Sequence, residues 1–262
     1  MRKFKLGVAL ESFAMRFRRA IEKASELEFD GVQVPGVGDL SPQELGETGR
    51  REFRNVLKSK NLDVASVSCV TRRGLSDPQN LEPRIEYVKS VMQLAYDLGG
   101  PIATIQAGQV PADEDDLEYK MLKETLTTLG EYGDRVGTTL ALETGLESGA
   151  TLAKLLDSID TGSLGVYFDP ANLTANSFRP FEAVQALAGR IVQVQARDAR
   201  RSSPNRMAQI VPLGHGEVDW MGLVAELEGT DYHGWIVLKC ENKDRSLGPI
   251  EEGLGFLRRF VG

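Results

Sequence analysis

Segments with the alternating hydrophobicity of a β-strand are each followed by a segment with helical periodicity, and this order occurs eight times along the 262 residues. Glycine stands just before several strands, as in "FDGVQV", "LGGPIATI" and "HGWIVL", where helix ends and turns favour it. The main alternative is a doubly wound sheet, but no strand leads into its G-x-G-x-x-G fingerprint. Eight units without a break in composition predict an α/β fold, a single (β/α)₈ TIM barrel over residues 1–262. The predicted strands are residues 5–10, 31–34, 63–69, 102–106, 139–143, 165–169, 191–195 and 235–241.

The predicted strands carry apolar residues on one face and small or polar residues on the other. In "RIVQVQARDA", Gln193, Gln195 and Arg197 alternate with apolar side chains. The same alternation places Glu143 and Asp169 at the ends of the polar faces of two earlier strands. In a barrel the apolar faces pack under the helices, so we expect the polar faces to point into the barrel interior.

Composition limits the classes of partner. The formal net charge is −7, and basic residues are mixed with acidic ones along the chain, which argues against a nucleic-acid surface. No run approaches the roughly 20 apolar residues of a membrane span, and the early run "LGVAL" is too short for a secretion signal. The only cysteines, Cys69 and Cys240, suit a reducing compartment. We therefore expect a cytoplasmic protein that acts on small polar molecules and binds neither nucleic acid nor membrane.

Oxygen-bearing side chains stand at the C-terminal ends of the last four predicted strands, where barrel enzymes hold catalytic groups. Glu143 and Asp169 are 26 residues apart, Gln195 follows after 26 more, and Glu241 after another 46. Three carboxylates at one barrel mouth repel one another unless a cation or bound protons neutralise them. These residues therefore predict a divalent ion, Mn²⁺ or Mg²⁺, with oxygen ligands. Solvated loop starts, or a simple Asp-Pro turn at Asp169, are the alternative.

The chain resembles the xylose isomerase-like barrel superfamily, in its sugar phosphate isomerase/epimerase branch. The segments "LALETG", "GVYFDPANL", "RIVQVQARDA", "LGHGEVDW" and "LKCEN" carry the resemblance. It implies a divalent metal held by residues of strands five to eight, which correspond here to Glu143, Asp169, Gln195 and Glu241. It also implies that Glu143 and Glu241 act as the acid and base that move a proton through a cis-enediolate.

This chain departs from the family pattern at several of these positions. The family usually has His where Gln195 stands, often His at Asn172, and often His or Glu at Gln106 and Gln33. An amide carbonyl ligates a hard cation but binds a transition metal less well than imidazole does. The expected site thus either prefers harder ions or has decayed.

Five further residues are candidates for binding the substrate: Glu11, Gln106, Asn172, Arg201 and His215. His215 lies in the glycine-flanked loop "LGHGEVD" at the same end as the acids, where a surface turn is the competing interpretation. Arg201, like Arg197, could bind phosphate or hydroxyl groups, although "RDARR" also reads as a solvated loop. Lys239 faces the barrel interior one layer below Glu241, so it needs an ion-pair partner there.

The favoured function is a metal-dependent isomerase or epimerase of a small sugar, sugar phosphate or polyol derivative. The alternative is a non-catalytic or regulatory sugar-binding barrel whose metal site is degenerate because Gln195 replaces His. An abasic-site endonuclease of the same superfamily would need a basic groove and a richer His, Asp and Glu cluster, which the sequence lacks. Hydrolase or dehydratase chemistry on a polyol stays open, as does the oligomeric state, a homodimer included.

Overall fold

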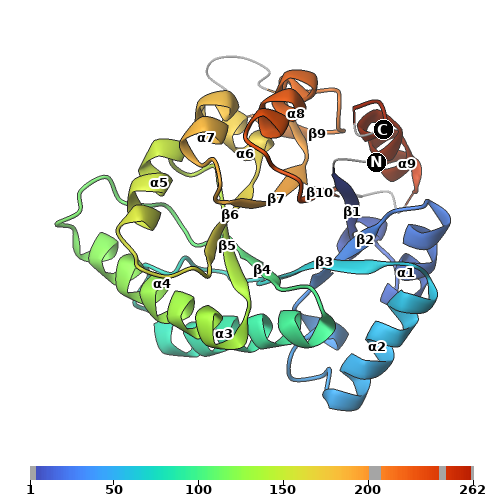
Figure 1. Cartoon of the computed structure of the whole chain (residues 1–262), viewed down its shortest axis with the longest axis horizontal. Coiled ribbons are helices and arrows are strands. Elements are labelled where there is room, and N and C mark those ends of the chain that lie inside the picture. Colours follow the sequence, from blue (N-terminus) through green and yellow to red (C-terminus); the bar gives the residue numbers. More distant parts are fainter. Residues whose placement is uncertain (1–3, 201–207, 242–245, 261–262) are drawn as a thin grey trace.

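A closed barrel of eight parallel strands forms the centre of the protein (Figure 1). The computed structural model describes residues 4–200, 208–241 and 246–260. Strand β1 pairs with both β2 and β10, which closes the sheet, and the order around the barrel confirms the fold predicted from the sequence. The strands are β1 (Lys5–Ala9), β2 (Gly31–Pro35), β3 (Asp63–Ser68), β4 (Ile102–Ile105), β5 (Thr139–Glu143), β6 (Leu164–Phe168), β7 (Ile191–Ala196) and β10 (Trp235–Leu238).

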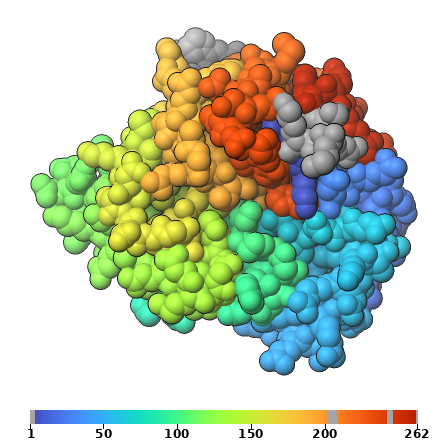
Figure 2. All heavy atoms as spheres, in the orientation of Figure 1, coloured from blue at the N-terminus to red at the C-terminus, as the bar shows by residue number. Residues whose placement is uncertain are grey.

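Helices surround this barrel, and in the same view the space-filling picture shows side chains filling the gaps between the ribbons (Figures 1 and 2). The α-helices are α1 (Phe17–Glu26), α2 (Glu47–Ser59), α3 (Leu81–Leu98), α4 (Leu117–Val136), α5 (Gly149–Asp157), α6 (Pro170–Ala175), α7 (Pro180–Ala186), α8 (Trp220–Gly229) and α9 (Gly248–Leu257). Two short 3₁₀ turns, Leu10–Phe13 and Gly38–Leu40, follow β1 and β2. No helix within the described ranges has the length and apolarity needed to cross a membrane.

A short helix and a hairpin at the C-terminal end of the barrel were not predicted from the sequence. Helix α6 has only six residues and begins with Pro170, directly after Asp169 caps it. A small antiparallel hairpin pairs β8 (Asp198–Arg200) with β9 (Gln209–Val211) inside the long insertion after β7. Elements this short give too few residues for a hydrophobic period to emerge.

The apolar and polar strand faces point as the alternation predicted. Ile236 and Leu238 of β10 belong to the large core between sheet and helices, whereas Val237 joins Ala9 and Ala65 in a small cluster inside the barrel. Small side chains line this interior because eight converging strands leave little room.

The barrel interior also contains polar side chains. Gln33 donates from Nε2 to Ser66 Oγ at 3.0 Å and to Thr104 Oγ1 at 3.3 Å. Gln193 is fully buried, and neither atom of its amide has a hydrogen-bond partner among the described residues. The Gln33 amide inside the barrel therefore has hydrogen-bond partners, whereas the Gln193 amide has none among the described residues.

Candidate active site

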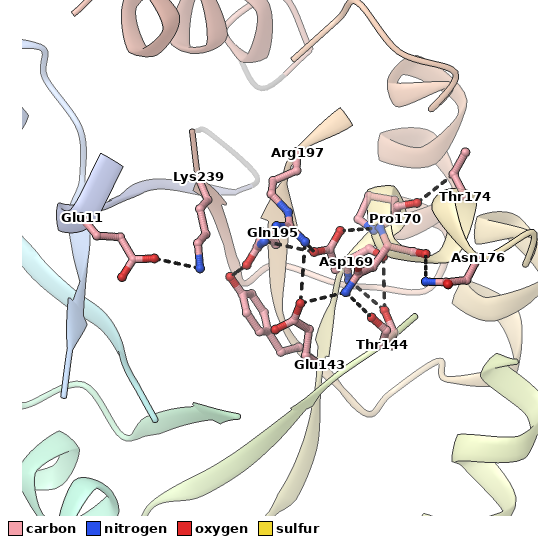
Figure 3. A network of polar contacts seen from close by, with 12 residues as sticks. Glu11, Glu143, Thr144, Asp169, Pro170, Thr174, Asn176, Gln195, Arg197 and Lys239 are labelled. Carbon is pink, nitrogen blue, oxygen red and sulfur yellow. Dashed lines mark hydrogen bonds and ion pairs between the residues drawn. The ribbon is translucent and has the colours of Figure 1, made fainter. Parts of the chain in front are cut away.

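Three of the predicted site residues converge at the C-terminal ends of β5, β6 and β7 (Figure 3). Glu143 is the last residue of β5, and Asp169 follows β6. Asp169 is fully buried and caps α6, because its Oδ1 accepts the backbone N–H of Asn172 at 3.0 Å. Gln195 is buried within β7 and donates from Nε2 to Asp169 Oδ2 at 3.0 Å. Neighbouring parallel strands thus bring side chains that are 26 residues apart into one cluster.

Arg197 provides the positive charge of this cluster. Its Nη2 donates to Asp169 Oδ2 and lies 3.7 Å from Glu143 Oε1, and only 12% of the side chain is exposed. Burial by itself lowers the pKa of the guanidinium, but Asp169 and Glu143 more than compensate and raise that pKa above its ordinary value. Arg197 therefore stays charged and neutralises part of the carboxylate pair. The alternation with Gln195 was the sequence signal that placed it inside, yet its contact with the acids was not predicted.

Tyr167 is a second residue that sequence reasoning did not assign to the site. Its hydroxyl donates to Gln195 Oε1 from the adjacent strand β6. Burial, together with the nearby charges of Glu143 and Asp169, raises the pKa of this phenol well above its ordinary value. Tyr167 therefore remains a hydrogen-bond donor and holds the amide of Gln195 in place.

Glu143 has the electrostatic environment of a general base. Burial raises its pKa to about 7, the charge of Asp169 adds to the rise, and Arg197 and Lys239 oppose it. Asn172 Nδ2 donates to Glu143 Oε1 at 2.9 Å and orients the carboxylate. A carboxyl group with a pKa near neutrality can take up and release a proton at the pH of most cells.

Glu11 and Lys239 form a separate ion pair on the β1 and β10 side of the barrel, apart from the Glu143 cluster (Figure 3). Lys239 Nζ lies 2.8 Å from Glu11 Oε1, and both side chains are partly exposed, at 31% and 39%. Glu11 is thus the ion-pair partner that the sequence required for Lys239. Its role in substrate binding stays a prediction.

Three further predicted site residues, Gln106, Glu241 and His215, lie at the same end of the barrel. Gln106 is exposed immediately after β4, and Glu241 is exposed three residues after β10 ends. His215 is exposed in the loop before α8, where its carbonyl oxygen accepts a hydrogen bond from Arg200. Arg201 lies outside the described residues. The functions predicted for these four residues remain predictions.

Asp198 holds the loop that carries His215. Its buried carboxylate accepts backbone N–H groups from both sides of the hairpin: Ala199 at 2.9 Å, Gly214 at 3.0 Å, Gly216 at 2.9 Å and Val218 at 3.1 Å. A Cβ atom on Gly216 would lie 1.9 Å from Asp198 Oδ1, so only glycine fits there. The loop is therefore fixed to the residue that directly follows Arg197.

A cavity of about 480 Å³ opens between the β4–α4 and β5–α5 loops. Glu147 lines it, is only 7% exposed, and accepts the backbone N–H of Val110 at 3.1 Å. Burial raises the pKa of Glu147 to about 7, while the hydrogen bond from Val110 opposes the rise. Sequence reasoning missed Glu147, which belongs to no strand and follows no period.

The donor set at the Glu143 cluster fits the predicted divalent ion in chemistry. Glu143, Asp169 and Gln195 offer carboxylate and amide oxygens, which are the ligands that Mg²⁺ and Mn²⁺ prefer. The Arg197 guanidinium shows that a cation is stable against these carboxylates. No three His, Cys, Asp or Glu side chains of the described ranges are grouped to hold a metal, so Glu241 does not join the other acids in this arrangement.

The sequence is related to known sugar-modifying proteins. A family model described as "Xylose isomerase-like TIM barrel" matches residues 21–260. The inosose dehydratase of Salmonella typhimurium (strain LT2) is 23% identical over 264 residues, covering 90% of this chain and 84% of that protein.

Solved structures share the fold along nearly the whole chain. The xylose isomerase domain protein from Planctomyces limnophilus superposes with a TM-score of 0.86 at 20% identity, covering 98% of this chain and 95% of that one. The D-psicose 3-epimerase of Clostridium cellulolyticum H10, solved with D-tagatose, gives 0.77 at 13% identity, covering 98% and 99%. A xylose isomerase-like TIM barrel protein from Mycobacterium smegmatis, solved in complex with magnesium, gives 0.75 at 18% identity, covering 100% and 97%.

The family model begins within helix α1 and extends past α9, so it includes every strand from β2 to the last. The chain therefore belongs to the xylose isomerase-like TIM barrel family, as its sequence motifs predicted.

Proposed function

We propose that this protein is an isomerase or epimerase of a small sugar, sugar phosphate or polyol derivative that carries a carbonyl group, and that Glu143 moves the proton. The observation that carries the proposal is the position of Glu143 at the barrel mouth with a pKa of about 7. A base is most effective when its pKa lies near the working pH, because it is then both available and strong enough.

The names of the relatives support a sugar-modifying enzyme. One is an inosose dehydratase and another a D-psicose 3-epimerase. Dehydration and epimerisation next to a carbonyl share their first step, the removal of a proton from the carbon beside that carbonyl. A site with one carboxylate base, such as Glu143, therefore suits either dehydration or epimerisation.

Each residue of the cluster has a separate role in removing the proton. Glu143 takes the proton from the substrate carbon. Asn172 donates a hydrogen bond to the Glu143 carboxylate and so fixes its orientation. Glu241, in the loop that follows β10, is the proposed acid that returns a proton to the opposite side. Of the four predicted ligands, Glu143, Asp169 and Gln195 lie together and would hold a Mn²⁺ or Mg²⁺ ion. Such an ion would supply positive charge that stabilises the negative charge developing on the substrate as the proton leaves.

The second candidate is a sugar-binding barrel without turnover. The observation in its favour is that Arg197 neutralises Asp169 and Glu143, which leaves the pair with less attraction for a divalent ion. A protein of this kind would bind a sugar without removing a proton from it, whereas the enzyme would do both.

Proton exchange tests both candidates. The protein is incubated in D₂O with ketoses, cyclitol ketones and their phosphates, with and without Mn²⁺ or Mg²⁺, and loss of C–H signals is followed by NMR. We expect exchange at a carbon beside the carbonyl, and Glu143→Gln should slow it by about 10²- to 10⁴-fold. Glu131→Gln, on the exposed face of α4, is the matched control. Saturable binding with no exchange for any ligand would establish the binding barrel instead.

A further inference from the structure

The two carboxylates of the site and Arg197 form a nearly closed charge group. Asp169 is fully buried, Glu143 is 17% exposed, and the guanidinium that lies against them is 12% exposed. Charges this far from water need a counter-charge, because burial of an unpaired carboxylate is costly. Arg197 provides that counter-charge from within the chain.

We propose that Arg197 competes directly with the divalent ion, so that the ion and the guanidinium bind the same carboxylates in turn. This inference rests on the proposed function, whose metal site uses Glu143 and Asp169. Arg197 Nη2 contacts Asp169 Oδ2 and lies near Glu143 Oε1, and these are the oxygens that would face a cation. Two cations at one pair of oxygens repel each other, so binding of the ion requires Arg197 to withdraw.

The way Arg197 is held suits a side chain that moves. Its Nε is buried without a hydrogen-bond partner, and the contacts to Asp169 and Glu143 both come from Nη2. A guanidinium that is fixed for structure alone more often uses two nitrogens in a parallel fork. The backbone beside it is fixed by the four N–H groups that Asp198 accepts, so withdrawal is a rotation of the side chain. Once released at the mouth, the guanidinium can pair with a negatively charged oxygen of the substrate.

Calorimetric titration of the metal-free protein with Mn²⁺ alone tests the competition. Arg197→Met removes the guanidinium and keeps much of the apolar stem, so it should bind Mn²⁺ at least tenfold more tightly than the parent. Arg197→Lys, which keeps the charge, should bind close to the parent. Equal or weaker binding by Arg197→Met, including no binding by either protein, would overturn the inference.

A matched control separates competition from a general loss of stability. Arg50 forms a similar partly buried ion pair with Asp97 at 2.5 Å between outer helices. Arg50→Met should lower the melting temperature, as Arg197→Met should in the absence of metal, but leave Mn²⁺ affinity unchanged.

Observing the Arg197 guanidinium directly distinguishes its displacement by the ion from repulsion between two cations that remain bound together. The protein is labelled with ¹⁵N-arginine, and the guanidinium NMR signals of Arg197 are assigned as those missing from Arg197→Lys. On saturation with diamagnetic Mg²⁺ these signals should change from those of a hydrogen-bonded guanidinium to those of one that exchanges freely with water. Unchanged signals at full Mg²⁺ occupancy would mean that the two cations coexist. Neither measurement needs a substrate, so a failure here is distinct from a failure of the Glu143-dependent proton exchange.

Discussion

Asn172 Nδ2 donates a hydrogen bond to Glu143 Oε1 at 2.9 Å and thereby joins the first turn of α6 to the end of β5. The donor stabilises the charged carboxylate, so removing it should raise the pKa of Glu143 further. We expect Asn172→Leu to slow proton exchange about tenfold at pH 7 and to shift the rising limb of the pH profile to higher pH. Asn176→Ala, at the exposed end of the same helix, should leave the profile unchanged. A lower rate with an unshifted limb would mean that Asn172 contacts the substrate instead.

Gln195→His should change which metals bind. Imidazole is a softer ligand than an amide oxygen, so affinity for Co²⁺ or Zn²⁺ should rise tenfold to a hundredfold, about 1.4 to 2.8 kcal/mol, with little change for Mg²⁺. Competition titrations of the parent and the variant with each ion measure this ranking. An unchanged ranking would place Gln195 outside the ligand set.

Glu147 makes the stability of the protein depend on pH. Its folded pKa of about 7 exceeds the ordinary value of 4.5, so the folded chain holds the proton more tightly than the unfolded chain does. The free energy of unfolding should therefore fall as pH rises from about 4.5 to about 7.

Glu147→Gln removes this titration and should be more stable than the parent at pH 8, by up to about 3 kcal/mol. The difference should shrink toward pH 4.5, which urea unfolding at several pH values can measure. Glu118→Gln, an exposed position on the same cavity, is the control that should follow the parent throughout. A constant difference between Glu147→Gln and the parent across pH would contradict the assignment.

Gln193 offers a test of the polar barrel interior. Both ends of its buried amide lack a partner among the described residues, so replacing it with an apolar side chain of similar volume removes an unsatisfied group. We expect Gln193→Leu to raise the free energy of unfolding by about 1 kcal/mol. Gln33→Leu, which leaves Ser66 and Thr104 without their donor, should lower it. Destabilisation by Gln193→Leu would instead indicate that internal water satisfies this amide.

The sequence predicted the barrel and the inward direction of its polar residues because both depend on periods repeated over many residues. The ends of seven strands could be located to within one residue, which was enough to bring Glu143, Asp169 and Gln195 together, whereas β10 ends three residues earlier than predicted.

Pairwise contacts at the barrel mouth could not be predicted in this way. Arg197 was predicted to point inward, but a guanidinium can reach several neighbours. Its contact with Asp169 depends on the register of β6 against β7, which shifts between Val166 and Tyr167. Glu147 was missed because its burial arises from two loops that meet only in the folded chain. Glu241 follows the pattern of the other acids in sequence, yet β10 ends at Leu238 and leaves it in a loop, exposed.

The anchoring of the hairpin by Asp198 has a consequence for the evolution and engineering of substrate range. One carboxylate holds the backbone on both sides of the insertion, at Ala199 and at Gly214 to Val218. Because these anchored positions lie on either side of residues 201–208, we expect Gln195 and Arg197 to keep their positions when that stretch of sequence is changed. Under the proposed function, a loop grafted there from a relative should alter which sugars are accepted while proton exchange at Glu143 is retained.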